Sequence, residues 1–440
     1  MGSGGCTVGL TGLLVLVVMC GTAAASGLRV RLSAARPSLA SSLQPGSRRL
    51  TPSLVKSVKL PVWPVHAGVV AQVLEWIGLA DAAEAVVSSV GGRVVPIQMG
   101  AQGTSPWLLL AHHQHSFTPF DPLRAISSLL LPEGFPAHPH SGFSTLTYAI
   151  EGGLRHRDSE GLKMSYGDGD VQLMTAGRGT IHEEMWDLEE ASQKQQHKRI
   201  ELFQLWVNSP AKDKFCAPRV EHLRSRNVPL LTCKTSGLTA KAICGSVSLG
   251  SDAASAAEGP LDALMHSPVA VLHVTLPPLA RVHVEALDGQ CSFVAYVRRG
   301  LAQLPGAAEG GEGRGARMGD LLLFEQGGGA GTAEVGEEEE EEEKQGEGEG
   351  EGEGASVFAE LVAGPRGLDA LLLLGQPLRE PVMMQGPFVH ASEQGYRRAA
   401  AAFGQLGNGA YWDHTATDED WQRHTRAVDL QGRLKQLLGL

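Results

Sequence analysis

Two short pairs of metal-ligating residues within one glycine-bearing stretch, residues 134–185, constrain this chain more than any other feature. His138 and His140 form the first pair, and His182 and Glu184 form the second. Because residues i and i+2 of a β-strand point to the same face, each pair directs two ligands the same way from one strand. Two such strands side by side would build a site of three imidazoles and one carboxylate. Such a set suits iron, copper, nickel or zinc and leaves positions for substrate or oxygen.

A blander interpretation is that these are two unrelated surface pairs, because short motifs also arise by chance. The presence of both pairs and the glycines around them favour a metal site. A further HxH occurs in the run His112, His113 and His115, but it has no downstream partner pair of its own. We therefore interpret this histidine run as a solvated loop rather than as ligands.

Length, charge and cysteine spacing limit the domain organisation and the classes of function that are possible. A chain of 440 residues predicts two or more domains, with a core large enough to be stable without disulfide bonds. Residues 334–353 hold twelve glutamates and one lysine, a charge of −11, which equals the net charge of the chain. The remainder is neutral overall and builds no basic surface for nucleic acid. Cysteines 216, 233, 244 and 291 show no CxxC spacing, which favours reduced thiols.

The N-terminal 60 residues have the composition of a targeting leader. Residues 8–25 are apolar and small residues follow, as in a signal peptide, although no basic residue precedes them. From Met1 to Leu74 there are seven Lys/Arg and no acidic residue, as in a transit peptide. We expect a bipartite plastid leader or a secretory signal, or a wrongly assigned start codon and a cytoplasmic or nuclear protein. No later segment is apolar enough to span a bilayer, so no membrane contact is expected after removal of the leader.

The middle of the chain alternates short apolar runs with turn signals. After a helical segment over residues 61–92, strands are expected at residues 94–95, 107–110, 144–150, 170–174 and 202–207. A second set of similar spacing is expected at residues 270–274, 280–284, 292–297, 320–324, 357–361 and 370–374. This spacing is typical of antiparallel barrels or sandwiches, and its repetition indicates a duplicated barrel.

Two segments depart from the strand pattern. Residues 327–354 are rich in glycine and glutamate and cannot bury a core, so we expect a disordered acidic loop between two strands. The tail, residues 391–440, is expected to form helices over residues 393–406 and 418–438.

The motifs resemble the pirin family of the cupin superfamily. The matching blocks are Phe135-x-x-His138-Pro139-His140-x-Gly142-Phe143, residues 167–185 around Thr175-Ala176-Gly177-Arg178-Gly179, Leu205-Trp206-Val207-Asn208, and residues 375–382 and 385–389. The likeness runs from about Arg93 to Phe403 and is weak over residues 210–365.

This resemblance implies an all-β fold of two cupin-type β-barrels, a bicupin, with short C-terminal helices. The N-terminal barrel would span residues 93–225 and hold the metal. The C-terminal barrel would span residues 226–390 and lack one, which agrees with the absence of any HxH after residue 140. We expect a monomer that does not bind nucleic acid directly.

The resemblance further implies that His138, His140, His182 and Glu184 bind one iron, as Fe2+ or Fe3+, with Cu, Ni, Co, Mn or Zn as alternatives. The general cupin pattern has a glutamate shortly after the HxH, where this chain has Ser144. That departure leaves the ligands in place but alters the hydrogen bonding around them. Arg178 is expected to be structural or to support the ligands rather than to be catalytic.

The chemistry implied is that of a quercetin 2,3-dioxygenase, in which dioxygen opens the ring of a small phenolic flavonol and carbon monoxide is released. Glu184 would be a ligand that also takes the proton of the substrate hydroxyl, or a plain ligand without that role. The alternative function is a non-enzymatic iron-containing, redox-sensing transcription cofactor that binds a partner. The leader argues against a nuclear cofactor but does not establish catalysis.

Overall fold

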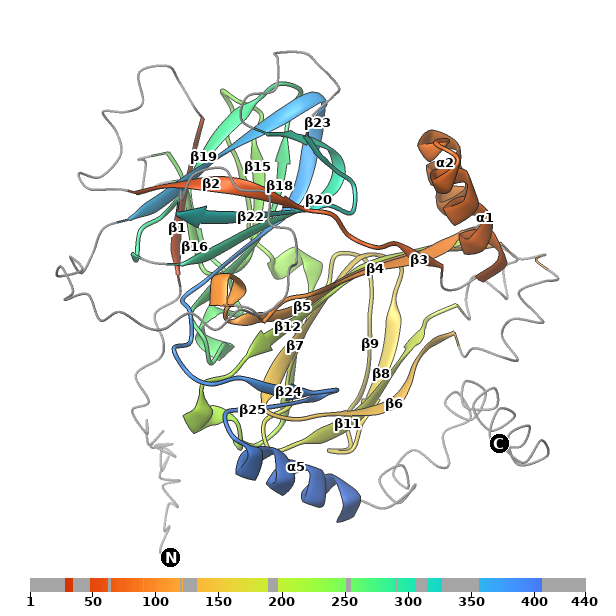
Figure 1. Ribbon diagram of the computed structural model, residues 1–440, viewed down its shortest axis with the longest axis vertical. Helices are drawn as coiled ribbons and strands as arrows, with labels where there is room; N and C mark the ends of the chain where they lie inside the picture. Colours follow the sequence, from red (N-terminus) through yellow and green to blue (C-terminus); the bar gives the residue numbers. More distant parts are fainter. Residues whose placement is uncertain are drawn as a thin grey trace, which may run out of the picture.

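The computed structural model describes residues 28–34, 48–61, 65–89, 91–100, 102–118, 121, 133–188, 197–250, 255–289, 291–304, 315–326 and 356–405. The expected all-β architecture of two barrels is confirmed: within these ranges three short helices accompany the strands (Figure 1). The expected helix at 418–438 and the acidic loop 327–354 lie outside the described residues.

The first barrel pairs a seven-stranded sheet, in the order β13-β10-β7-β12-β5-β4-β3, with a four-stranded sheet, in the order β6-β11-β8-β9. Its strands are β3 (Leu60–Pro61), β4 (Gly92–Gln98), β5 (Trp107–Phe117), β6 (Gly134–His140), β7 (Phe143–Glu151), β8 (Leu154–Asp158), β9 (Lys163–Tyr166), β10 (Val171–Thr175), β11 (Thr180–Trp186), β12 (Lys198–Asn208) and β13 (Arg219–Leu223).

The second barrel is one twelve-stranded sheet. Its strands are β1 (Arg29–Ala34), β2 (Arg48–Val55), β14 (Leu230–Thr232), β15 (Thr239–Cys244), β16 (Ser246–Leu249), β17 (Ala256–Glu258), β18 (Val269–Leu276), β19 (Arg281–Ala286), β20 (Ser292–Gln303), β21 (Gly315–Arg317), β22 (Leu321–Gln326) and β23 (Val357–Gly375). The long strand β23 replaces the two strands expected at 357–361 and 370–374: its first part pairs with β19, and its second with β18 and β20.

Both faces of the seven-stranded sheet are buried, and they differ in chemistry. On β7, Leu146 and Tyr148 belong to an apolar cluster that also contains Val271 and Leu373 of the second barrel. On the alternate face of β7, Thr145 and Thr147 are equally buried but polar, and the Thr147 hydroxyl faces Glu184 of the four-stranded sheet. Strand residues alternate between faces, so packing of the barrels against each other fixes which side chains point into the first barrel.

The chain returns to the first barrel after β23. A small hairpin, β24 (Met383–Gln385) with β25 (Phe388–His390), and helix α5 (Glu393–Gln405) lie beside β7 and β11 (Figure 1). Helix α5 matches the helix expected at 393–406.

The segment between residues 61 and 92 forms two helices rather than one, α1 (Val65–Trp76) and α2 (Ala80–Ser89). Gly78, with φ +85°, ends α1, and the Leu79 amide donates to the Leu74 carbonyl at 2.8 Å. This is the Schellman type of helix end, which favours glycine in the left-handed conformation.

The expectation of a solvated loop for the histidine run was wrong. His112, His113 and His115 lie in the middle of β5 and are 1%, 6% and 2% exposed. Strand β5 is a central strand that pairs with β4 on one side and β12 on the other, and its residues are buried on both faces of the sheet. Apolar and polar residues do not alternate in this stretch, so the sequence pattern did not indicate a strand.

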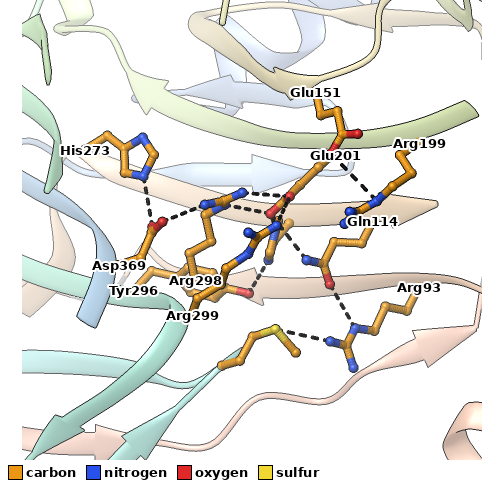
Figure 2. Close-up of polar contacts among 12 residues, drawn as sticks. Arg93, Gln114, Glu151, Arg199, Glu201, His273, Tyr296, Arg298, Arg299 and Asp369 are labelled. Carbon is orange, nitrogen blue, oxygen red and sulfur yellow. Dashed lines mark hydrogen bonds and ion pairs between the residues drawn. The ribbon is translucent and has the colours of Figure 1, made fainter. Parts of the chain in front are cut away.

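A buried polar network around Glu201 lies at the contact between the barrels (Figure 2), and His112 belongs to it. Its centre is Glu201 of β12, whose carboxylate accepts hydrogen bonds from His112 at 3.0 Å and from Arg298 at 2.7 and 2.8 Å. Arg298 of the second barrel also donates to Asp369 at 2.6 Å, and Asp369 contacts His273 at 2.9 Å. The network therefore joins β12 and β5 of one barrel to β20, β23 and β18 of the other.

These contacts keep Glu201 ionised. Burial opposes its ionisation, but the hydrogen bonds and charges of His112 and Arg298 outweigh burial and lower the pKa of the Glu201 carboxyl. A carboxyl whose pKa is lowered on folding adds stability above its unfolded value, near 4.5, and loses it as the pH falls.

Two N-terminal strands lie within the span that the sequence marks as a leader. Strand β1 pairs with β16 and β19, and strand β2 pairs with β22 and β23. Leu28, Val30, Leu32 and Leu50 are at most 4% exposed and belong to the core of the second barrel. Removal of a leader after residue 60 would take both strands away, whereas removal before Leu28 leaves every described strand of this barrel in place.

Truncation at these two points should therefore have different outcomes. We expect deletion of residues 1–27 to leave the melting temperature unchanged. Deletion of residues 1–60 should lower it or make the protein insoluble, because each buried Leu or Val contributes about 1.5–3 kcal/mol. Solubility and thermal melts of the two proteins test this, and equal melting temperatures would contradict a structural role for β1 and β2.

Removal of the arginine that bridges the barrels should destabilise the protein strongly. Arg298→Met leaves Glu201 buried without its main partner, which costs about 3–5 kcal/mol. Arg299→Met is the matched control: Arg299 contacts the same carboxylate at 3.2 Å but is 51% exposed, so its loss should cost at most about 1 kcal/mol. Denaturant unfolding measures both, and equal effects would show that the buried pair does not hold the barrels together.

Candidate metal centre

The four ligands predicted from the sequence lie on two paired strands of the four-stranded sheet. Strands β6 and β11 run antiparallel with His138 opposite His182, and the register shifts between His182 and Glu184. Strand β6 is at the edge of its sheet, a position that tolerates Pro136 and Pro139, which lack an amide proton. The HxH motif can therefore contain prolines without breaking a central ladder.

The structure brings the three histidines together. One ring nitrogen from each of His138, His140 and His182 lies within 4.8 Å of the others. The Nε2 atoms of His138 and His182 are 3.0 Å apart, about the separation of two nitrogens bound ~2.1 Å from one ion. His140 is 2% exposed, and within the described part of the chain neither of its ring nitrogens has a hydrogen-bond partner.

Hydrogen bonds at the far side of the rings assign the tautomers. Nδ1 of His138 donates to the Pro136 carbonyl at 2.8 Å, which leaves the Nε2 lone pair directed at His182. On the far side of His182, its Nδ1 lies 3.4 Å from Nδ1 of His156. Two nitrogen lone pairs that face each other repel unless a cation lies between them. The residues present therefore fit a bound metal ion.

Burial prepares these imidazoles to be ligands. It lowers the pKa of His138 and holds the pKa values of His140 and His182 well below the usual value of 6.5. Neighbouring histidines lower the pKa values of His140 and His182 further. At neutral pH the rings are uncharged, and uncharged imidazole is the form that binds metals.

Glu184 lies beside this group rather than within it. Its carboxylate, with ring nitrogens of His156 and His182, forms a second group of atoms within 4.8 Å of one another. The Tyr166 hydroxyl donates to Glu184 Oε1, and the Thr147 hydroxyl lies 3.5 Å from the same oxygen. Burial, reinforced by the adjacent carboxylate, raises the pKa of Tyr166 well above 10, so the phenol stays a donor.

Sequence reasoning missed His156, which lies on β8 opposite Glu184 and is fully buried. A signal was available, because His156 and Asp158 form another i, i+2 pair between the two ligand pairs. Arg157, between them, points to the other face and donates to Glu183 at 2.7 Å. The face of β8 that carries His156 is therefore the face turned toward the ligands.

Two glycines around the ligands allow a close approach of the backbone. Gly142 and Gly177 have φ +84° and +49°, and a Cβ at either position would overlap a backbone carbonyl oxygen, that of Val389 or Cys216. Gly142 packs against the returning C-terminal hairpin, and Gly177 packs against the chain after β12. Only glycine permits this close approach.

The C-terminal hairpin braces the residue next to His140. The Ser141 amide donates to the Pro387 carbonyl at 3.1 Å, and its hydroxyl lies 3.2 Å from His390 Nε2. Lys214, 2% exposed, donates to the carbonyls of Gly142 and Val389 at 2.9 and 3.1 Å. Burial lowers the pKa of Lys214 to about 8.

The structure also gives the contacts of Ser144 and Arg178, two positions singled out in the sequence. Ser144, where cupins have a glutamate, is buried and donates to the Thr175 hydroxyl at 3.4 Å. Arg178 forms an exposed ion pair with Glu160 at 3.1 Å, which fits a structural role.

Within the described ranges, both groups of three or more possible ligands lie in the first barrel. His266, His273 and His283 of the second barrel each contact one carboxylate instead. Of the helices in the part of the chain described, none is long and apolar enough to cross a membrane.

Comparison with known proteins agrees with this architecture. The Pirin family pattern matches residues 92–207, and the Pirin C-terminal cupin domain matches residues 322–409. A pirin-like protein of Caulobacter vibrioides is 32% identical over 266 residues, which are 60% of this chain and 77% of that protein. A Pseudomonas aeruginosa protein named "Putative quercetin 2,3-dioxygenase" is 32% identical over 269 residues, 60% of this chain and 77% of that one.

A solved structure shares the fold. The crystal structure of quercetin 2,3-dioxygenase from Acinetobacter baumannii superimposes with a TM-score of 0.53 at 24% identity, over 72% of this chain and 91% of that one. With two matching domain patterns, relatives above 30% identity and a common two-barrel fold, the chain belongs to the pirin family of cupin proteins.

Proposed function

We propose that this protein is a metal-dependent dioxygenase that acts on a flavonol such as quercetin. The observation that carries the proposal is the group of three uncharged imidazoles, two of them fully buried and that of His138 half-buried, with a carboxylate beside it, inside the polar barrel of a pirin chain. The name of the Pseudomonas relative supports the choice of reaction. Iron is the proposed metal, and a small phenol and dioxygen are the proposed substrates.

The residues of the chain supply the surroundings that this reaction needs. His138, His140 and His182 would hold the ion, with Glu184 within reach as a fourth ligand. When bound, the metal would act as a Lewis acid that lowers the pKa of the flavonol hydroxyl. Glu184 would take the proton of that hydroxyl, and the Tyr166 phenol stabilises the charged carboxylate by its hydrogen bond.

The wall opposite the ligands offers polar groups to a bound substrate. On the seven-stranded sheet Gln172 pairs with Thr147, and Thr145 pairs with Met174. Gln172 Oε1 and Thr145 Oγ1 are buried and have no hydrogen-bond partner among the residues that the structure describes. Buried polar atoms normally find a partner, so these two atoms suit a ligand with several hydroxyl groups or ordered water.

The ligand assignment predicts that metal binding can be lost without loss of the fold. His138→Ala and His182→Ala should each abolish metal binding and leave the circular dichroism spectrum and melting temperature of the metal-free protein largely unchanged, because each barrel has its own apolar core. His197→Ala is the control, since His197 is exposed and lies outside the ligand group, with its Nε2 2.8 Å from the Ser89 carbonyl. Full metal content in either ligand variant would refute the assignment.

The reaction predicts loss of the visible absorption of quercetin when protein reloaded with iron, copper, nickel or cobalt is incubated with it in air. Glu184→Gln should reduce kcat by about 10²–10⁴-fold if Glu184 is the base. Metal content of the same variant distinguishes the two roles, because a plain ligand would lose metal together with activity. Glu160→Gln, an exposed carboxyl in the same barrel, is the control.

If no loaded form turns over quercetin, the enzyme proposal falls for this substrate. Full metal content without turnover would instead favour the non-enzymatic, partner-binding alternative.

A further inference from the structure

Behind the metal-binding face of His182 lies a chain of three buried side chains. His182 Nδ1 is 3.4 Å from His156 Nδ1, and His156 Nε2 is 3.2 Å from Asp158 Oδ2. His182 and His156 are 0% exposed, and Asp158 is 1% exposed. All three come from β8 and β11, which pair directly, with His182 opposite Asp158.

The direction of the hydrogen bonds in this chain is determined by its last member. A carboxylate only accepts, so His156 Nε2 carries the proton that is donated to Asp158. In the neutral ring, Nδ1 of His156 is then an acceptor, and the proton between the two Nδ1 atoms belongs to His182. His182 is left with its lone pair on Nε2, the nitrogen that faces His138.

Asp158 is itself anchored by backbone. Its Oδ1 accepts the amides of Glu160 and Leu162 at 2.9 and 3.0 Å, in the turn between β8 and β9. This fixes the carboxylate in one orientation and leaves Oδ2 for His156. The chain therefore leads from a rigid turn, through two imidazoles, to the metal-facing nitrogen of His182.

We propose that His156 and Asp158 are positioning residues that hold His182 in the tautomer and ring orientation required for metal binding. The inference rests on the metal centre of the proposed function but not on its substrate. Hydrogen bonds behind a histidine ligand fix its ring and raise its basicity, and their removal typically weakens metal binding about 10–100-fold. His156 acts through His182 rather than as a ligand, because its Nε2 is occupied by Asp158.

The test measures the affinity of metal-free, full-length protein for Co2+, by titration and by the visible spectrum of the bound ion. His156→Phe keeps a buried ring of similar shape without hydrogen bonds, and Asp158→Asn removes the charge with little change of volume. Each variant should bind Co2+ about 10–100-fold more weakly with a shifted spectrum. The double variant should be no weaker than His156→Phe alone, because Asp158 acts through His156.

A matched control is His222→Phe. His222 forms the same type of pair, with Asp170 at 2.9 Å, in the same barrel, but this pair is not bonded to a ligand. Its Co2+ affinity should equal that of the unaltered protein. Melting temperatures of the metal-free proteins show whether a loss of affinity reflects unfolding, and Asp158→Asn serves as the milder variant if His156→Phe is unstable.

Three results would overturn the proposal. The first is unchanged Co2+ affinity in both single variants. The second is complete loss of binding in His156→Phe together with retained binding in His138→Ala, which would make His156 a ligand. The third is the absence of Co2+ binding by the unaltered protein, which would remove the metal centre as well. Tight, His156-dependent Co2+ binding without quercetin turnover would leave this inference standing and refute only the substrate.

Discussion

The apolar contact between the two barrels determines the chemistry of the space inside the first one. Leu146 and Tyr148 of β7 are committed to this contact, which the hydrophobic effect stabilises. Alternation along the strand then turns Thr145 and Thr147 inward, where each is 1% exposed. Buried polar groups require partners. Glu184 of the four-stranded sheet opposite lies 3.5 Å from the Thr147 hydroxyl, so a polar interior that can hold a metal follows from the way the barrels pack. In the second barrel the corresponding run, Leu371 to Leu374, is apolar on both faces.

Local spacing was sufficient to predict the ligands and most of the strands. An i, i+2 pair places both side chains on one face whatever the rest of the fold does, so the convergence of His138, His140 and His182 could be predicted from residue types alone. The positive φ of Gly142 and Gly177 was predictable for a similar reason, because a glycine-rich turn next to a ligand indicates close backbone approach. The side of the cluster on which Glu184 lies was not predictable, because the register of β11 against β6 shifts between His182 and Glu184 and the Tyr166 hydroxyl of β9 bonds to the carboxylate.

What the sequence did not reveal depends on partners far away in the chain. His112 is buried because the second barrel, including Tyr296, packs on the face of the sheet that carries it, and nothing within β5 itself indicates that contact. Strands β1 and β2 have basic, serine-rich surroundings typical of a leader, and their strand identity comes from β16, β19, β22 and β23. His156 was missed for a different reason. Its i, i+2 spacing to Asp158 was visible in the sequence, but an HxH pair is a stronger indication of metal ligands than an HxD pair.

The two ends of the described chain are exchanged between the barrels. The first strands, β1 and β2, complete the second barrel, and the last hairpin, β24 and β25, braces Ser141 and Gly142 of the first. A chain is synthesised from its N-terminus, so all four ligands leave the ribosome before strands β14 to β23 of the second barrel. The hairpin of β24 and β25 leaves the ribosome after all of these strands. A nascent chain that stops short of β24 would already carry the complete ligand set without the segment that steadies it. The exchange of ends thus couples the maturation of the metal centre to completion of the polypeptide.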